Sequence, residues 1–165
     1  MPEGYRVSYE ITHHGPTDLP VPSFFVEVGS TAAEWNDEKA YTAAAKSVLY
    51  AKPDDEAIPL IGFGGTHYAV RQSTIAENTK GAFGHMMHSR DVKNITKEII
   101  LQMSAKSGGI SAAHIDRKAM TKEEAARISA ILEELEIPEI TEGELEKINH
   151  LSYASWKKYT KFAEG

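Results

Sequence analysis

The feature that most constrains this fold is the alternation of short apolar runs with longer segments that begin with helix-capping residues. The run from Ile58 to Phe63 consists of apolar residues, which is typical of a strand covered on both faces. Further runs with strand character cover residues 5–12, 23–28, 81–87 and 110–115. The alternation predicts a layered α/β fold with a mostly parallel or mixed sheet and helices on both faces.

Helical segments are predicted between and after these runs. They cover residues 32–50, 71–78 and 94–107, and two more begin after Thr121 and Thr141. The threonines at 31, 121 and 141 are each followed three positions later by glutamate, which is the spacing of a capping box. Apolar residues recur four apart within 94–107, so we expect that helix to bury one face.

Composition narrows the class of protein. The chain has 165 residues, 41% of them hydrophobic and 25% charged, so we expect a single domain over residues 1–165. It has no cysteine, which excludes disulfides, iron–sulfur clusters, cysteine-ligated zinc and a cysteine nucleophile. A net charge of −6 disfavours a general electrostatic grip on nucleic acid. Without an apolar span or a signal-peptide pattern, we expect a cytoplasmic protein with no membrane contact, either a monomer or a small homo-oligomer.

Histidines lie near the ends of several apolar runs. In open α/β sheets ligands bind beyond the carboxyl ends of the strands, so these imidazoles are predicted to meet at one edge. They are His13, His14, His67, His85, His88 and His114. Adjacent residues on an extended chain point to opposite sides, so at most one of His13 and His14 is expected to face a given pocket unless the turn at Gly15-Pro16 redirects the other.

The segment from Gly64 to Arg71 carries the strongest local signal. Two glycines let the backbone approach a ligand closely and can expose N–H groups. His67 suits a general base near neutral pH, Tyr68 can donate a hydrogen bond or stack on a base, and Arg71 can hold a phosphate or carboxylate. The alternative is a glycine turn between strand and helix with Arg71 in solvent.

Other polar residues permit two interpretations each. Glu27 in an apolar run is paired, bound to metal or shifted in pKa, unless the run is an edge strand with Glu27 facing water. His85 and His88 share a face only if their segment is helical. His114 and Asp116 are co-facial on a strand, as a ligand or an orienting pair, or His114 is a half-buried core residue.

The C-terminal segment permits two interpretations, and several hydrolase motifs are absent from the sequence. Lysines interleaved with aromatic residues over 156–162 indicate either an RNA-binding patch or, more simply, an amphipathic helix with wet lysines. There is no Gly-x-Ser-x-Gly, Walker or His-Glu-x-x-His motif. Hydrolysis by this chain would therefore use water activated by histidine, glutamate or metal.

Several motifs, taken in order, resemble one known family. They are Thr12-His13-His14-Gly15-Pro16, the segment 22–31, Gly64-Gly65-Thr66-His67-Tyr68-Ala69 and Gly84-His85. This pattern resembles the archaeal and plant type of D-aminoacyl-tRNA deacylase and extends over nearly the whole chain. The resemblance implies an α/β fold related to phosphorylases, peptidyl-tRNA hydrolase and zinc carboxypeptidases. It also implies an ester hydrolase that acts on D-aminoacyl-tRNA, in association with zinc.

Two departures from that family pattern stand out. Family members usually carry a further N-terminal segment that this chain lacks, which leaves the activity of this chain alone as a question. The glycine-rich motif usually continues with proline after Tyr-Ala, where this chain has Val70. We expect a less rigid loop at that point, with His67 and Arg71 retained.

We assign candidate roles on this basis. His13, Glu27 and His85 are the candidate ligands of a zinc ion, and the candidate catalytic residues are His67, His14 and Tyr68. The candidate substrate-binding residues are Gly64, Gly65, Thr66, Arg71 and His88. Backbone N–H groups of the two glycines are candidate oxyanion donors. Two rival hypotheses are a metal-dependent amidase or carboxypeptidase-like hydrolase of a small substrate, and a non-catalytic tRNA-binding fragment.

Overall fold

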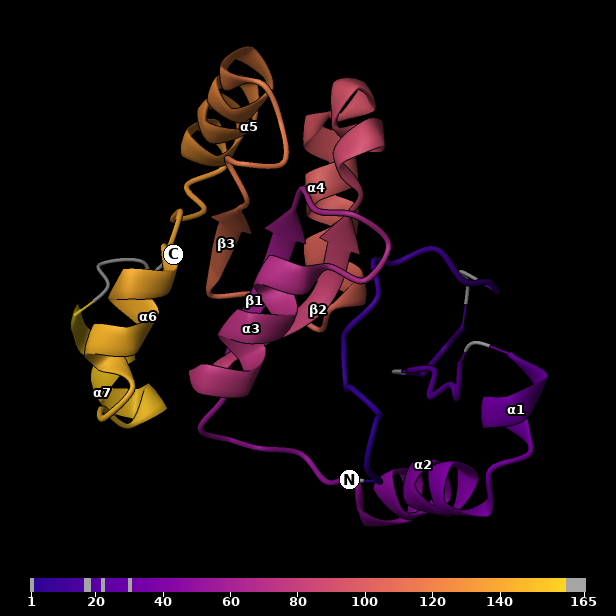
Figure 1. The fold of residues 1–165 in the computed structure, drawn as a ribbon. Helices are drawn as coiled ribbons and strands as arrows, with labels where there is room; N and C mark the ends of the chain where they lie inside the picture. The colour runs from indigo at the N-terminus through magenta and orange to yellow at the C-terminus, as the bar shows by residue number, and fades with distance from the viewer. Residues whose placement is uncertain (1, 17–18, 22, 30, 160–165) are drawn as a thin grey trace. The chain divides into compact units, whose positions relative to one another are not determined.

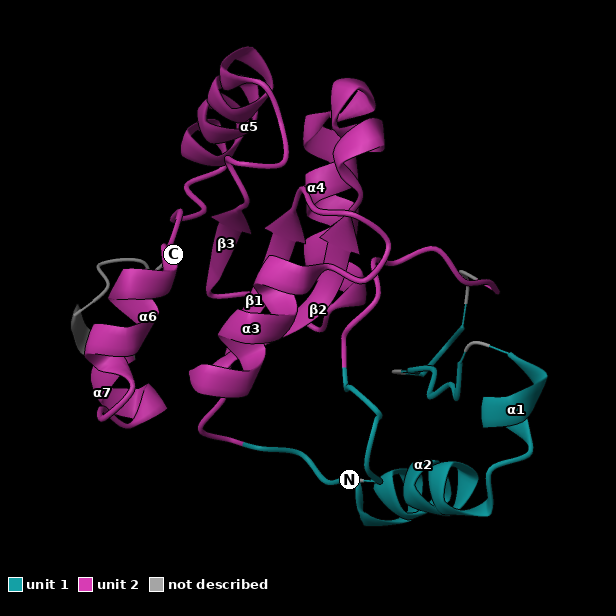
Figure 2. Ribbon diagram, viewed as in Figure 1, with its two compact units in different colours: residues 1–7, 18–54 teal, residues 8–17, 55–165 magenta. Residues whose placement is uncertain are grey.

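The computed structural model describes residues 2–16, 19–21, 23–29 and 31–159. Of these, residues 157–159 are described by their backbone alone. It divides into two compact units, one of residues 1–7 and 18–54 and the other of residues 8–17 and 55–165 (Figure 2). The single domain expected from chain length stays a prediction.

A parallel three-stranded sheet forms the centre of the second unit (Figure 1). Its strands are β1 (Ile58–Phe63), β2 (Gly81–Met87) and β3 (Ala112–Ile115), in the order β2-β1-β3. Both neighbours of β1 run parallel to it, so the predicted parallel α/β architecture is confirmed. An irregularity between Leu60 and Ile61 accommodates Gly84 on β2, where a side chain would collide with Ser107.

Helices cover both faces of this sheet, because alternate residues of β1 are buried on opposite sides. Ile61 and Phe63 pack with η1 (Ser89–Asn94), α4 (Lys97–Lys106) and α5 (Lys122–Glu134). Ile58 and Leu60 pack with α3 (Val70–Asn78), α6 (Glu142–Ile148) and α7 (Tyr153–Tyr159). The segments that carry histidines lie at the carboxyl ends of the strands.

Two of the predicted strands are wrong. Residues 5–12 and 23–28 have no regular strand structure, and Phe24, Phe25 and Val26 are exposed. Local hydrophobic alternation does not suffice for a strand, because a strand also needs a partner for its backbone groups. Near its end the first segment forms isolated hydrogen bonds, from Tyr9 N–H to Ser73 Oγ, from Ile11 N–H to the His67 carbonyl and from Thr12 N–H to the Met86 carbonyl.

The first unit contains two helices where one was predicted over 32–50. They are α1 (Ala32–Trp35) and α2 (Glu38–Tyr50), and the break falls at Asp37. Asp37 caps α2, since its side chain accepts a hydrogen bond from the Lys39 N–H at 2.8 Å, and it also accepts one from the Tyr5 hydroxyl at 2.9 Å. Aspartate favours such caps over helix interiors.

The predicted capping boxes at Thr31, Thr121 and Thr141 are all confirmed. The helix predicted after Thr141 ends earlier than expected, at Ile148, and Trp156 belongs to the separate helix α7, where it is buried. Within the described part of the chain, every helix is too short or too polar to traverse a lipid bilayer.

Candidate functional site

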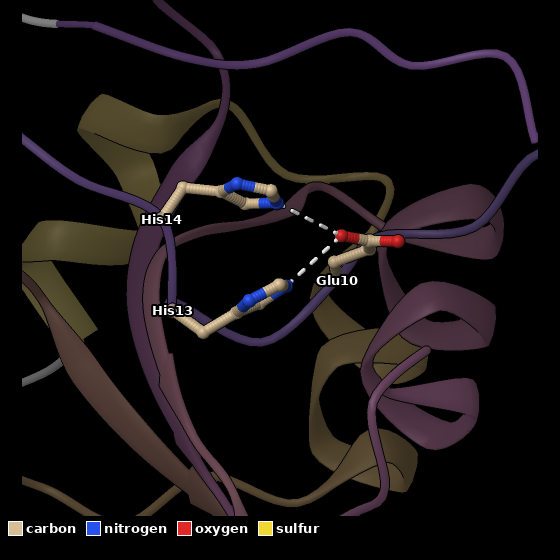
Figure 3. Close-up of side chains that lie close together, drawn as sticks. All are labelled: Glu10, His13 and His14. Carbon is tan, nitrogen blue, oxygen red and sulfur yellow. Dashed lines mark hydrogen bonds and ion pairs between the residues drawn. The ribbon is translucent and has the colours of Figure 1, made fainter.

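Three imidazoles meet at a single carboxylate beside the sheet. His13 and His14 lie with their Nε2 atoms 3.1 and 3.4 Å from Glu10 Oε2 (Figure 3). His67 approaches the other oxygen, with its Nε2 3.1 Å from Glu10 Oε1. The rings of His13 and His67 are 4.6 Å apart, and Tyr68 meets His67 edge-on at 4.9 Å. Glu10, His13, His14 and His67 are called the Glu10 cluster below.

Backbone hydrogen bonds hold the two segments of this cluster together. Ile11 N–H donates to the His67 carbonyl at 3.0 Å, so the loop after β1 and the N-terminal segment are joined directly beside Glu10. Thr12 N–H donates to the Met86 carbonyl at 2.9 Å, and the Met86 N–H donates back to Thr12 Oγ1 at 3.0 Å. The buried side chains of Ile11 and Met86 pack beneath these bonds.

The imidazoles also set the charge state of Glu10. Partial burial acts to raise the pKa of its carboxyl, but hydrogen bonds from His13 and His14 and the nearby charge of His67 outweigh it, so the pKa is lowered. Glu10 is therefore ionised at neutral pH. Its side chain is 25% exposed and that of His67 is 48% exposed, so a substrate can reach both.

His13 and His14 follow the alternative in which the turn redirects one of the two rings, because the chain bends at Thr12 and Gly15 and is not an extended strand. Both rings point to the same carboxylate, with their centroids 4.1 Å apart. Sequence reasoning also missed Glu10. The available signal was a carboxylate between Tyr9 and Ile11, a few residues before paired histidines.

The glycine loop adopts the conformation that requires glycine. Gly64 and Gly65 have φ angles of 91° and 96°, in the region that favours residues without a side chain. The Gly64 N–H donates to the Met87 carbonyl at 2.9 Å. The role of Gly64 as an oxyanion donor stays a prediction. Within the described chain the Gly65 N–H has no such partner. Thr66 is exposed, and its carbonyl accepts the Ala69 N–H.

His85 and His88 have other neighbours on β2 and beyond it. The His85 ring is half-buried and its Nδ1 lies 2.9 Å from Ser107 Oγ; burial and the charge of Lys106 lower the pKa of His85. His88 caps η1 by accepting the Arg90 N–H at 3.0 Å. The predicted roles of both residues stay predictions.

Glu27 belongs to the first unit, where it is exposed on an irregular segment. Its predicted role as a ligand therefore stays a prediction. Arg71, on the first turn of α3, forms an ion pair with Glu142 at 2.8 Å. The side chains of Lys157 and Lys158, and all of Lys161, lie outside the described residues.

Comparison with known proteins identifies the family. A model of the D-aminoacyl-tRNA deacylase family matches residues 1–140, a range that includes the whole Glu10 cluster. The chain belongs to the D-aminoacyl-tRNA deacylase family. The resemblance inferred from the motifs is thereby confirmed.

Archaeal members of the family show how far this likeness extends. The chain is 65% identical to a D-aminoacyl-tRNA deacylase of Methanocorpusculum labreanum over 163 residues, which are 99% of this chain and 37% of that relative. It is 51% identical to one from Methanoregula boonei over 158 residues, 95% of this chain and 36% of the relative. The chain thus spans little more than a third of the length of these deacylases.

A solved structure supports the fold. The crystal structure of a conserved protein of unknown function superposes with a TM-score of 0.75 and 30% identity, covering 85% of this chain and 50% of that one. The parallel α/β sheet expected for the family is therefore confirmed.

Three residues of the Glu10 cluster offer a donor set for a metal ion. One carboxylate oxygen and two imidazole nitrogens, from Glu10, His13 and His14, lie within 4.8 Å of one another. Zinc in catalytic sites takes such nitrogen and oxygen ligands from three residues. In the described part of the chain this group shares His13 with the predicted ligand set and contains neither Glu27 nor His85.

Proposed function

We propose that this chain takes part in hydrolysis of the ester bond of D-aminoacyl-tRNA, releasing a free D-amino acid and tRNA. The observation that carries the proposal is the convergence of His13, His14 and His67 on Glu10, in segments matched by the family model. The archaeal relatives named D-aminoacyl-tRNA deacylase support the same activity. A cytoplasmic location, where charged tRNA is used, is part of the proposal.

Zinc is the metal we propose for the Glu10 cluster, with Glu10, His13 and His14 as its ligands. A zinc ion held by three protein groups retains one position for water and lowers the pKa of that water to about 7. Glu10 suits this role because its carboxyl is ionised at neutral pH. His67 contacts the opposite oxygen of Glu10 and is thereby kept beside the ligands.

Proton transfer is the role we propose for His67. Its half-exposed ring accepts a proton as water attacks the ester carbonyl, and returns it to the ribose oxygen as the carbon–oxygen bond breaks. The Gly65 N–H, two residues before His67, is the candidate donor to the oxyanion. Tyr68 lies edge-on to the His67 ring and restricts its orientation.

Deacylation of D-Tyr-tRNA by wild type and His67→Ala tests the proposal. Loss of a general base lowers kcat by about 10²- to 10⁴-fold, and His150→Ala, a change at an exposed histidine on another segment, should leave the rate unchanged. Chelator should remove activity from wild type, and zinc should restore it. Equal rates for wild type and His67→Ala would eliminate His67 from the mechanism.

Binding assays separate this function from the rival hypotheses. A small-substrate amidase should ignore the nucleic acid, so hydrolysis of a small ester or amide without affinity for D-Tyr-tRNA would favour that reading. Affinity for D-Tyr-tRNA without turnover under any metal condition would favour a tRNA-binding role.

A further inference from the structure

A second polar site lies at the carboxyl end of β3, on segments that the Glu10 cluster does not use. A cleft of about 190 Å³ opens between residues 114–118, residues 139–142 and Arg71 of α3. This volume is below the roughly 300–1,000 Å³ of pockets for drug-sized ligands, so the cleft suits a much smaller molecule. The backbone of Asp116 adjoins Gly64, which places the cleft next to the glycine loop.

Positive and negative side chains line the cleft in equal number, but not all of them form ion pairs with one another. Arg71 is paired with Glu142 at 2.8 Å, and Arg117 is held by Glu139 with contacts of 2.7 Å to each carboxylate oxygen. These pairs neutralise the two guanidinium groups and fix their positions.

One cation and one anion are left over. Among the described residues Lys118 and Asp116 have no partner of opposite charge in an ion pair, although Asp116 Oδ1 accepts the Lys118 N–H at 3.2 Å. A ligand that matches this cleft therefore carries one negative and one positive group.

A buried imidazole in the cleft wall also lacks a hydrogen bond. His114 is 5% exposed, and its Nδ1 atom is fully buried with no partner in the described structure. Burial lowers the pKa of His114 against the raising effect of the Asp116 carboxylate, so the ring is neutral and can complement either a donor or an acceptor. An unmet polar atom at such a depth costs stability. Because His114 also lines the cleft, its ring is close enough to report on a ligand bound there.

We propose that this cleft binds a free α-amino acid as a zwitterion, with its carboxylate at Lys118 and its ammonium at Asp116. An amino acid esterified to ribose has no free carboxylate, so the cleft matches the product of ester hydrolysis better than the substrate. The inference goes beyond the proposed function, because the cleft binds its ligand whether or not the Glu10 cluster hydrolyses an ester.

Binding of glycine to the purified chain, measured by calorimetry and by NMR of the histidine side chains, tests this site. We expect saturable binding that shifts the His114 resonance. Glycine methyl ester, which has only the ammonium, and acetate, which has only the carboxylate, should each bind at least about tenfold more weakly. Equal binding of either analogue, tighter binding of inorganic phosphate, or no binding of glycine would overturn the proposal.

Two variants locate the ligand in the cleft. Lys118→Gln and Asp116→Asn should each weaken glycine binding at least about tenfold, whereas Lys122→Gln, at an exposed lysine on α5 outside the cleft, should not. Far-ultraviolet circular dichroism checks that each variant is folded. If Asp116→Asn fails to fold, Lys118→Gln decides alone, because Lys118 is exposed. Unchanged affinity in a folded Lys118→Gln protein would contradict the assignment.

Discussion

Replacing Gly64 by alanine should destabilise the second unit far more than a similar change at another glycine of positive φ. A Cβ at position 64 would lie 2.8 Å from Met120 Cε and 3.0 Å from the backbone oxygen of Asp116. The methionine methyl can move, but the carbonyl belongs to Asp116, which directly follows β3 and whose N–H bonds to Phe63 of β1, so it cannot move without disturbing the sheet. Gly108 has φ 76° and no atom within 4 Å of such a Cβ, so it is the matched control.

The magnitude follows from adding these effects. A non-glycine residue in a sparsely populated backbone conformation costs about 1–3 kcal/mol, and both variants carry that cost. Overpacking adds about 1–3 kcal/mol at Gly64 only. The reduced freedom of the unfolded chain is the same in both variants and cancels in the comparison. Gly64→Ala should therefore be about 1–3 kcal/mol less stable than Gly108→Ala.

Urea unfolding followed by tryptophan fluorescence measures this difference. The chain has two tryptophans, and in a Trp35→Phe background the buried Trp156 alone reports on the second unit. Unfolding midpoints at equal slope give the difference in free energy of unfolding. If Gly64→Ala and Gly108→Ala unfold at the same urea concentration, the close approach of Asp116 to Gly64 does not exist in solution.

Three further outcomes are expected. Glu10→Gln should weaken zinc binding, measured by competition with a chromophoric chelator, by more than the roughly 10–100-fold typical of changes to outer-sphere partners; an unchanged Kd would exclude Glu10 as a ligand. Because burial lowers the pKa of His114, the unfolded chain binds a proton below pH ~6.5 that the folded chain does not, so the free energy of unfolding should fall from pH 7.5 to pH 5.5. The fall should be smaller in His114→Gln, where the lowered pKa of His85 still contributes. Equal falls in wild type and His114→Gln would refute this. Thr121→Ala should cost about 1 kcal/mol in urea unfolding through loss of the α5 cap, and Thr96→Ala, at the cap of α4, should cost a similar amount, so a negligible loss in both would contradict the role of the caps.

The parts of the fold that depend on local chemistry were predictable from the sequence. The strands Ile58–Phe63 and Gly81–Met87 have the predicted bounds, because each joins apolar residues to a clear turn signal. The capping boxes were equally readable, since the threonine and glutamate that form them are three residues apart.

The segments that failed depend on partners distant in the chain. Residues 5–12 contain the alternation expected of a strand. In the described structure, however, only the backbone N–H groups of Ile11 and Thr12 donate to carbonyls of the loop after β1 and of β2. Periodicity describes which side a residue faces once a strand exists, but not whether a neighbouring strand is present. The run of 23–28 was predicted from its apolar residues and not from alternation, but Phe24, Phe25 and Val26 are exposed and the run pairs with none of the described strands.

Contacts between segments distant in the chain also determine which residues make up the Glu10 cluster. On β2, neighbouring side chains face opposite sides, and Met86 packs on Ile11 while His85 contacts Ser107 of the segment after α4. The histidine nearest the predicted edge is thus turned from the face to which the N-terminal segment binds. Because residues 10–14 bend, the side chains of Glu10, His13 and His14 reach one another without belonging to a strand. The alternation of side chains along a strand does not predict this arrangement. The position of histidines at strand ends therefore predicts the edge of the sheet where the cluster lies. Which side chains meet at that edge is determined by the backbone hydrogen bonds of Ile11 and Thr12, which the sequence pattern does not reveal.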